Sequence, residues 1–417
     1  MKSLDEALLQ LLAHAAGAAR LPSESIQLTN ALNRVLAQEV VSPICVPAYD
    51  NSQMDGYAGV AVEMNNALEP LVVSQRIPAG HPGKPLKPGT VVRIFTGAPI
   101  PQGANAVIMQ EQVRQVDDDH VQCLEPVTPG QNIRLKAADL SSGQVILSQG
   151  KKLSAADIAL AASVGVTQIT VYQRLKVAVF SSGDELRQPG EPLEFGQIYD
   201  SNRPMVLNLV KAMGLDASDM GCLPDRLDTT RQALGQAAST HDVILTCGGV
   251  SVGEEDHIKA AISAEGQLDL WKIALKPGKP FAFGQVGKAT FLGMPGNPVA
   301  AWVTFAMLIR PYLMLRAAGG MRHQHDRSGA AHGSASLDAL IPSGYRVVAA
   351  FDWSFPDARQ EFLRGWIDHQ GRAQIHDRQN SAVLSSVTAS TGLIEIPALT
   401  PVRQGDVVRY IPYAELQ

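Results

Sequence analysis

The chain has 417 residues, of which 45% are hydrophobic and 18% are charged, so it can bury several cores and is not a disordered protein. Its formal net charge of −5 and its aromatic content of 5% argue against a nucleic-acid surface as the main partner. Four scattered cysteines without a C-x-x-C pair are typical of a reduced, cytoplasmic protein. We expect no signal peptide, because the N-terminus lacks a charged segment followed by an apolar core. We expect no membrane span, because no uncharged apolar run reaches about 18 residues.

The first 46 residues predict helices followed by an extended segment. Ser3 and Glu6 have the spacing of a capping box at the start of an amphipathic helix. A second, short helix is expected around residues 30–38, and residues 40–46 look extended between prolines. A further helix is predicted after residue 154, with a capping box at its start and Gly165 at its end.

Residues 71–125 show short β runs interrupted by Pro and Gly. Turn signals recur roughly every eight to twelve residues, which predicts a small β domain. Asp55 and Gly56 form a dipeptide that is typical of a tight turn. The acidic run at residues 117–119 predicts a solvated hairpin tip without a function.

The segment from residue 174 to residue 320 alternates buried strands with helices. Apolar runs at residues 176–182, 243–246 and 290–292 stop at glycines or polar turns, as buried strands of a parallel sheet do. A helix is expected to begin at Ser201 or Asn202. The last apolar run predicts a long buried helix, and Arg310 and Pro311 inside it argue against a membrane span.

Ligands of open α/β sheets bind beyond the carboxyl ends of the strands, where this chain places charges of both signs. Carboxylates follow separate strands at Asp184, Glu185, Asp225 and Asp256. Such a cluster suits Mg²⁺, which takes oxygen ligands and bridges to phosphates. The lysines of the same stretch, which offer ammonium groups to an anion, are Lys272, Lys276 and Lys279. Solvated charges at the strand ends would explain the same pattern.

Two turns in this segment can let a ligand approach the backbone closely. The first contains Gly248, Gly249, Ser251 and Gly253, and the second contains Pro295, Gly296, Asn297 and Pro298. Glycine leaves room for a ligand, and the helix start near Pro298 should present free N–H groups to an anion. Plain turns remain the alternative. The two standard phosphate fingerprints are absent, and no triad or reactive cysteine is apparent, so positioning and electrostatics would carry the reaction.

The remaining chain predicts a linker and a second β domain. Residues 318–335 contain His323, His325 and His332, whose irregular spacing favours a solvated linker over a metal site. Residues 336–417 contain five short alternating β runs separated by turns.

Seven motifs then appear in a consistent order over about residues 1–320, namely PAYDNSQMDGYA, RIFTGAPIPQGANAVIMQE, VFSSGDEL, IYDSNRPM, TCGGVSVGEEDHIK, KPGKPFAFG and GMPGNPV. Together they resemble the molybdopterin molybdenumtransferase (MoeA) family, which is also similar to the C-terminal part of gephyrin. The resemblance implies insertion of molybdate into adenylylated molybdopterin with release of AMP and assistance from Mg²⁺. It also implies transient contacts with molybdopterin adenylyltransferase and with apo-molybdoenzymes.

The resemblance implies an elongated α/β plus β chain of four parts. These are an N-terminal helical and extended domain (1–46 and 140–173), a β insertion domain (47–139), a three-layer α/β pterin-binding domain (174–320) and a C-terminal β barrel (336–417). It also implies a homodimer with the site at the interface. Asp55 and Thr96, joined by Asp139, would come from one subunit. The residues expected from the other are Glu185, Asp225, Asp256, Lys272, Lys276, Pro295 and Pro298, with Arg364 and Ser381 from the C-terminal domain.

One departure from the family pattern precedes Asp139. Ala137 and Ala138 stand where the family has a glycine and an acid. A backbone that needs a positive φ at that glycine would have to shift. Two rival functions also remain. A molybdopterin adenylyltransferase would share the α/β domain but would not need the MDGYA and TGAP motifs of the β insertion. A non-catalytic scaffold would not need the acidic residues Glu185, Asp225 and Asp256.

Overall fold

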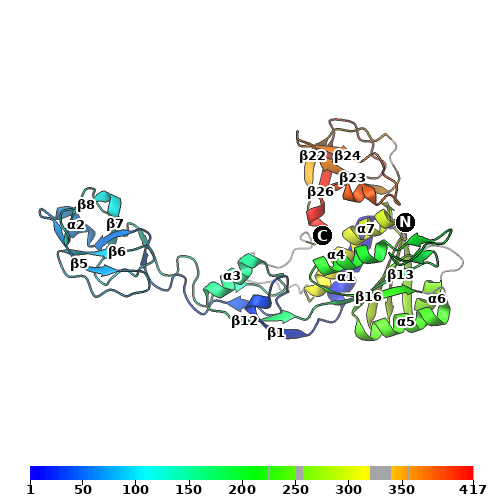
Figure 1. Cartoon of the computed structure of the whole chain (residues 1–417), viewed down its shortest axis with the longest axis horizontal. Coiled ribbons are helices and arrows are strands. Elements are labelled where there is room, and N and C mark those ends of the chain that lie inside the picture. Colours follow the sequence, from blue (N-terminus) through cyan, green and yellow to red (C-terminus); the bar gives the residue numbers. More distant parts are fainter. Residues whose placement is uncertain (224–225, 250–256, 320–339, 355–356, 417) are drawn as a thin grey trace.

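A computed structural model describes residues 1–223, 226–249, 257–319, 340–354 and 357–416. The predicted site residues Asp225, Ser251, Gly253 and Asp256 lie outside this described part, as do the three histidines of the linker. Figure 1 shows an elongated chain, with a β lobe at one end and an α/β domain beside a small β barrel at the other. A short middle segment connects the two ends.

The N-terminal helix α1 (Leu4–Gly17) begins with the predicted capping box, in which Ser3 and Glu6 bond each other's backbone N–H groups. It packs against the α/β domain in the largest core. The middle segment holds a second capping box, also as predicted, at Ser154 and Asp157. Its elements are β1 (Ser23–Gln27), η1 (Leu28–Asn30), β2 (Val40–Val41), β11 (Val145–Leu147), α3 (Ala155–Ser163) and β12 (Gln168–Tyr172).

The helix that we expected around residues 30–38 is absent, and the prediction was wrong. Asn33 has a φ of 63°, which a helix does not accept. The Leu36 N–H donates to Lys151 O and the Ala37 N–H donates to Thr170 O, so backbone bonds leave the segment instead of closing helical turns. Leu36 is fully buried in the middle segment.

The β lobe contains a six-stranded sheet in the order β7-β4-β6-β5-β9-β8. The acidic hairpin tip at residues 117–119 is confirmed between β8 and β9. Gly56 is the first residue of β4 and is not part of a tight turn. A glycine is needed there because a Cβ would lie 1.9 Å from Ile108 O of the neighbouring strand. The elements are β3 (Asn51–Ser52), β4 (Gly56–Gly59), α2 (Ala61–Asn66), β5 (Leu71–Ile77), β6 (Thr90–Ile94), β7 (Ala106–Met109), η2 (Gln110–Gln112), β8 (Val113–Gln115), β9 (His120–Cys123) and β10 (Ile133–Arg134).

The α/β domain is built on a six-stranded sheet in the order β16-β13-β17-β21-β20-β18. The three predicted strands are confirmed as β13, β17 and β21, and only β20 runs against the other five. The strands of this sheet are β13 (Lys176–Ser182), β16 (Asp216–Leu223), β17 (Val243–Cys247), β18 (Gly266–Lys272), β20 (Pro280–Val286) and β21 (Ala289–Met294). Three short strands lie outside the sheet: β14 (Leu186–Arg187), β15 (Ile198–Tyr199) and β19 (Leu275–Lys276).

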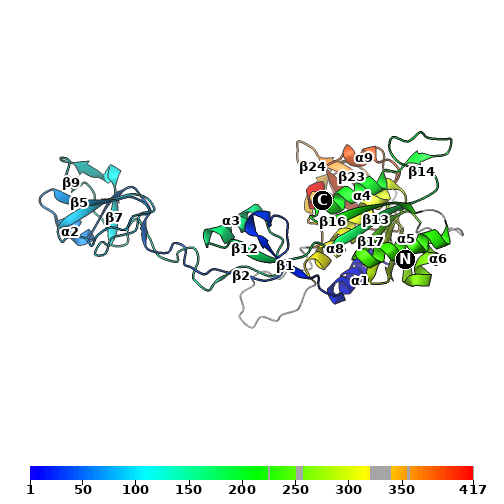
Figure 2. The same ribbon diagram turned by 60° about the horizontal axis from the view of Figure 1, so that its bottom comes forward.

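Alternate residues of the central strands enter separate cores on the two faces of the sheet, which gives the predicted three layers. Val179 and Leu245 face one core, while Phe180 and Ile244 face the other. Figure 2 shows the helices on both sides. They are α4 (Asn202–Ala212), α5 (Leu227–Thr240), α6 (His257–Glu265), α7 (Pro298–Thr304), the π-helical turn η3 (Phe305–Ile309) and α8 (Arg310–Ala317).

The predicted long helix runs without a break through α7, η3 and α8. Its 20 residues, Pro298–Ala317, have a mean hydropathy of 1.4, but 83% of the most apolar window is buried inside the protein. The helix is therefore a core element here. Pro311 is tolerated because it follows the π-helical turn, in the first turn of α8.

The C-terminal region forms a closed five-stranded barrel, because β23 pairs with both β24 and β25. All five predicted β runs are confirmed. The elements are β22 (Tyr345–Ala349), β23 (Gln360–Ile367), β24 (Arg372–Ile375), α9 (Ser385–Thr388), β25 (Gly392–Ile396), β26 (Val407–Pro412) and η5 (Tyr413–Glu415). The short strand β19 of the α/β domain pairs with β23, so the barrel is joined to that domain by backbone bonds.

Candidate functional site

One edge of the α/β sheet collects most of the predicted site. The pairing registers place Ser182, Cys247 and Met294 together at the carboxyl ends of β13, β17 and β21. Because β20 is antiparallel, it begins at this same edge, where Pro280 pairs with Lys272 at the end of β18. The chain therefore brings three predicted segments to one edge of the sheet: the glycine turn that begins at Gly248, the proline turn at residues 295–298, and the lysine loop at residues 272–279.

The glycine turn after β17 packs directly against the neighbouring strand ends. The Gly248 N–H donates to Met294 O at 3.0 Å. A Cβ at Gly248 would lie 2.6 Å from Ser182 O, and its φ of +93° also requires glycine. A Cβ at Gly296 would lie 3.8 Å from the Gly248 Cα. The turns after β17 and β21 thus form one continuous backbone surface.

The start of α7 offers fewer free donors than we expected. Pro298 has no N–H group, and the Val299 N–H donates to Ser381 O at 3.0 Å. A carbonyl of the barrel therefore accepts a bond from one of the N–H groups that we expected to be free for an anion at this helix start. Asn297 occupies the N-cap position without a side-chain capping bond.

Glu185 and Asp184 are exposed on the turn between β13 and β14, at the same sheet edge. Gly183 has a φ of +145°, and a Cβ there would lie 2.4 Å from Glu185 Oε2. The glycine therefore lets the Glu185 carboxylate fold back over the strand end. Across the described ranges, no group of three potential His, Cys, Asp or Glu metal ligands occurs.

A buried ion network lies beside this turn, and the sequence analysis missed it. Arg203 is 4% exposed and donates to Asp200 Oδ2 at 3.1 Å and to Asp219 Oδ1 at 2.6 Å. It also donates to Gln188, next to β14. The network ties α4 and β16 to the segment after β14, the short strand that follows the turn with Glu185. The i,i+3 spacing of Asp200 and Arg203 at the predicted helix start is the sequence signal for this ion pair.

Asn202 in the same segment is not a helix cap. Its Nδ2 donates to Gly296 O at 2.6 Å, which joins α4 to the turn after β21. Ser201 occupies the N-cap position without a side-chain bond. The IYDSNRPM motif therefore supports two neighbouring loops of the candidate site.

The three lysines have different surroundings. Lys272 and Lys279 are exposed at adjacent strand ends and form no ion pair within the described part of the chain. Lys276 lies on β19, and its Nζ is 3.1 Å from Glu361 Oε2 and 3.4 Å from Asp357 Oδ2. Hydrogen bonds from Arg359 hold the pKa of Asp357 well below its usual range. Lys276 is thus bound by two acids of the barrel.

Arg364 lies in the barrel with only 1% of its surface exposed. Its Nε donates to Ser386 Oγ at 3.1 Å, and its Nη2 donates to the carbonyls of Arg378 and Asn380 at 3.2 and 3.3 Å. Burial lowers the pKa of Arg364 to about 10. These bonds hold the loop that ends at Ser381, whose carbonyl binds the start of α7.

The β lobe carries the remaining predicted residues. Asp55 Oδ1 accepts bonds from the Thr96 N–H and the Thr96 hydroxyl, both at 2.8 Å. These two bonds lower the pKa of the Asp55 carboxyl. Asp139 is exposed on the neck of the lobe, where its N–H donates to Val46 O. Ala137 has a φ of 62°, so the backbone adopts the left-handed conformation at this position without a glycine.

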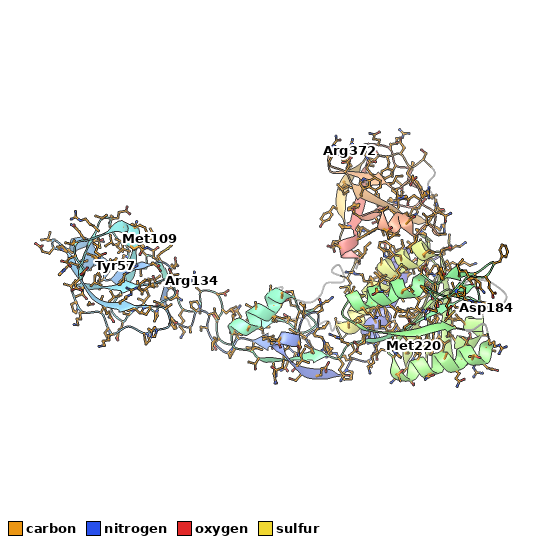
Figure 3. The ribbon with its side chains drawn as sticks, in the orientation of Figure 1. Tyr57, Met109, Arg134, Asp184, Met220 and Arg372 are labelled. Atoms are coloured by element: carbon orange, nitrogen blue, oxygen red, sulfur yellow. The ribbon has the colours of Figure 1, made fainter. Side chains whose placement is uncertain are left out.

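The chain does not bring these two groups of residues together. Figure 3 shows Tyr57, two residues after Asp55, at one end of the molecule and Asp184, next to Glu185, at the other. Within one chain, the β lobe cannot face the edge of the α/β sheet. A site that needs both groups requires a second copy.

Comparison with protein families finds three matches that follow one another along the chain. Residues 2–165 match the MoeA N-terminal region (domains I and II), residues 178–315 match a probable molybdopterin binding domain, and residues 346–413 match the MoeA C-terminal region (domain IV).

Curated relatives and solved structures agree with these matches. The chain is 40% identical over 356 residues to a molybdopterin molybdenumtransferase of Haemophilus influenzae, covering 85% of this chain and 84% of that one. It is 34% identical to molybdopterin molybdenumtransferase 2 of Mycobacterium tuberculosis, covering 89% and 90% of the two chains. A crystal structure of a molybdopterin biosynthesis MoeA protein from Pyrococcus horikoshii matches with a TM-score of 0.81 and 28% identity, covering 99% of this chain and 100% of that chain.

Proposed function

The chain belongs to the molybdopterin molybdenumtransferase (MoeA) family, and we propose that it inserts molybdate into adenylylated molybdopterin with release of AMP. The observation that carries this proposal is the shared sheet edge of the α/β domain. There, Lys272 and Lys279 lie at the ends of β18 and β20, next to the turn after β21, while the exposed carboxylate of Glu185 follows β13 farther along the same edge. Both substrates are anions, and one of them carries phosphates. A surface with ammonium groups, open backbone and a carboxylate suits such a pair.

The two kinds of charge at this edge have separate roles in the proposal. Lys272, Lys276 and Lys279 bind the phosphates and molybdate through their ammonium groups. The turns at Gly248, Gly249 and Gly296 let the pterin nucleotide approach the backbone. The additional substrate contacts that we propose are Ser251, Gly253, Pro295, Asn297 and Pro298.

We propose that Glu185, Asp225 and Asp256 hold Mg²⁺. Glu185 supplies the oxygen donor that this hard cation prefers, at the same edge as the lysines, and Gly183 leaves room for its carboxylate. When bound, Mg²⁺ would neutralise phosphate charge at the bond that releases AMP. The other two acids lie outside the described residues.

We further propose that the site is completed by a second copy of the chain, which would make the protein a homodimer of cytoplasmic location. Asp55 and Thr96, with Asp139 nearby, would come from the β lobe of one copy. Glu185 and the lysines would come from the α/β domain of the other. The separation of these groups along the molecule supports this arrangement (Figures 1 and 3). The four-part division of the chain expected from the sequence is part of the same proposal.

The test is AMP release from purified protein and adenylylated molybdopterin, with Mg²⁺ and with or without molybdate. We expect molybdate-dependent release and a product that activates an apo-molybdoenzyme. An E185Q variant serves as the control for the proposed metal ligand and should lose release while keeping its fold. Tight binding of the pterin nucleotide without release would contradict the proposal and favour a scaffold. Molybdate-independent transfer of adenylate would favour an adenylyltransferase.

A further inference from the structure

The C-terminal barrel contacts the loops of the candidate site at two separate places. The first is β19, where Leu275 and Lys276 pair with Gln360 and Glu361 of β23. The second is the bond from the Val299 N–H to Ser381 O at the start of α7. One contact lies in the lysine loop and the other in the proline loop. The barrel therefore contacts two loops of the candidate site, the lysine loop through β19 and the proline turn through the start of α7.

Glu361 is the barrel residue at the centre of the first contact. It is 1% exposed, and its two carboxylate oxygens have different partners. Oε1 accepts the Asp357 N–H at 3.0 Å, while Oε2 forms no hydrogen bond among the described residues and lies 3.1 Å from Lys276 Nζ as an ion pair. A buried carboxylate needs such partners, because leaving the charge unpaired would cost several kcal/mol. The backbone bond orients the carboxylate toward the lysine.

Lys276 is the more exposed partner in this pair. Its side chain is 38% exposed, whereas the Glu361 side chain is 2% exposed. A lysine on a flexible stem samples many positions in water, and a fixed buried carboxylate restricts them. Asp357, 3.4 Å away, adds a second acceptor, and Arg359 holds Asp357 in place through two bonds of 2.8 Å. The ammonium group is therefore held against the barrel, in the segment between β18 and β20.

We propose that Glu361 is a positioning residue of this enzyme, which places the Lys276 ammonium group for binding of the anionic substrate. The proposal rests on the proposed function, in which Lys276 contacts substrate and Glu361 does not. It assigns the C-terminal barrel a defined part in the reaction. The barrel supplies a rigid carboxylate, and β19 carries the lysine that the carboxylate orients.

A double-mutant cycle tests this assignment. Molybdate-dependent AMP release is measured for the wild type, E361Q, K276M and the double variant, with kcat and KM determined for each. Misplacement of the lysine by about 1 Å is expected to lower kcat/KM on the order of 10²-fold in E361Q. The double variant should lose no more than K276M alone, because Glu361 acts only through Lys276.

Two further variants separate positioning from stability. Asp368 pairs with Arg372 at 3.0 Å at the turn between β23 and β24, and its side-chain hydrogen bonds go to residues 370–374, so D368N removes another acid of the barrel away from the loop that carries Lys276. It should keep wild-type kinetics. E361D retains the charge and should recover part of the loss in kcat/KM at a melting temperature similar to that of E361Q. It also replaces E361Q in the cycle if E361Q does not fold.

The possible outcomes are distinct. An active wild type with normal kinetics in E361Q would overturn the inference while leaving the proposed function intact. Losses in E361Q and K276M that multiply in the double variant would also overturn it, because the two residues would then act independently. A wild type without molybdate-dependent release would instead refute the proposed function, and this inference with it.

Discussion

Thr96 donates both its backbone N–H and its hydroxyl to the same carboxylate oxygen of Asp55, at 2.8 Å each. Asp55 is half-buried, and this partial burial opposes the two bonds by raising the pKa, but the bonds outweigh it. They fix Oδ1, while Oδ2 has no hydrogen bond among the described residues and can bind a substrate or a metal-bound water in the proposed site. Because hydrogen bonds to the charged form favour it, they lower the pKa of Asp55. The two bonds thereby favour the ionised carboxylate of Asp55.

Replacing Thr96 by valine should raise the pKa of Asp55 toward its ordinary value. The variant loses the hydroxyl bond but keeps the backbone bond, so the shift is partial. Since Asp55 then takes up its proton at a higher pH, the acid limb of the pH–activity profile should move upward. Carboxylate NMR of Asp55 measures the change directly. T96S, which keeps the hydroxyl, should behave as the wild type, and an unchanged pKa in T96V would contradict this account.

Replacing Ala137 by glycine should stabilise the neck of the β lobe by about 1 kcal/mol, because alanine is strained at a φ of 62°. The Ala137 and Asp139 N–H groups donate to Pro47 O and Val46 O, so their hydrogen exchange reports on this region. Their protection should rise roughly fivefold. Ala138→Gly is the matched control, since Ala138 is exposed and is not among the residues with positive φ. Equal effects of the two substitutions would argue against strain at Ala137.

Replacing Arg203 by methionine should destabilise the α/β domain by roughly 3 kcal/mol, because Asp200, which is 2% exposed, would be left as a buried charge without its partner. Thermal or urea unfolding measures the loss. Arg174→Met provides the comparison, since the pair of Arg174 with Asp216 is half-exposed and 3.7 Å long. That variant should change stability by less than about 1 kcal/mol. A similar small effect of R203M would mean that the network is not needed for the fold.

The sequence predicted elements well where periodicity and local chemistry decide the structure. The capping boxes at Ser3 and Ser154, the strands β13, β17 and β21 and the five barrel strands all follow from local patterns. It failed at residues 30–38, where backbone bonds to β12 and to the segment before α3 override a helical pattern.

The candidate site was predictable in part. Strand ends and glycine turns indicated where the lysines and Glu185 would gather, because parallel strands bring their carboxyl ends to one edge. Contacts between distant segments could not be predicted. The pairing of Lys276 with Glu361, the bond from Val299 to Ser381 and the bond from Arg203 to Asp219 all join residues whose spacing in sequence carries no local signal.

The most direct test of the central claim is complementation between two inactive variants, D55A and E185A, produced together in one cell and purified as a mixture. Each variant alone should show no molybdate-dependent AMP release. If the site combines the β lobe of one copy with the α/β domain of another, mixed dimers contain one intact site, and the mixture should recover about a quarter of wild-type activity. No recovery from a mixture shown to contain mixed dimers would contradict a shared site.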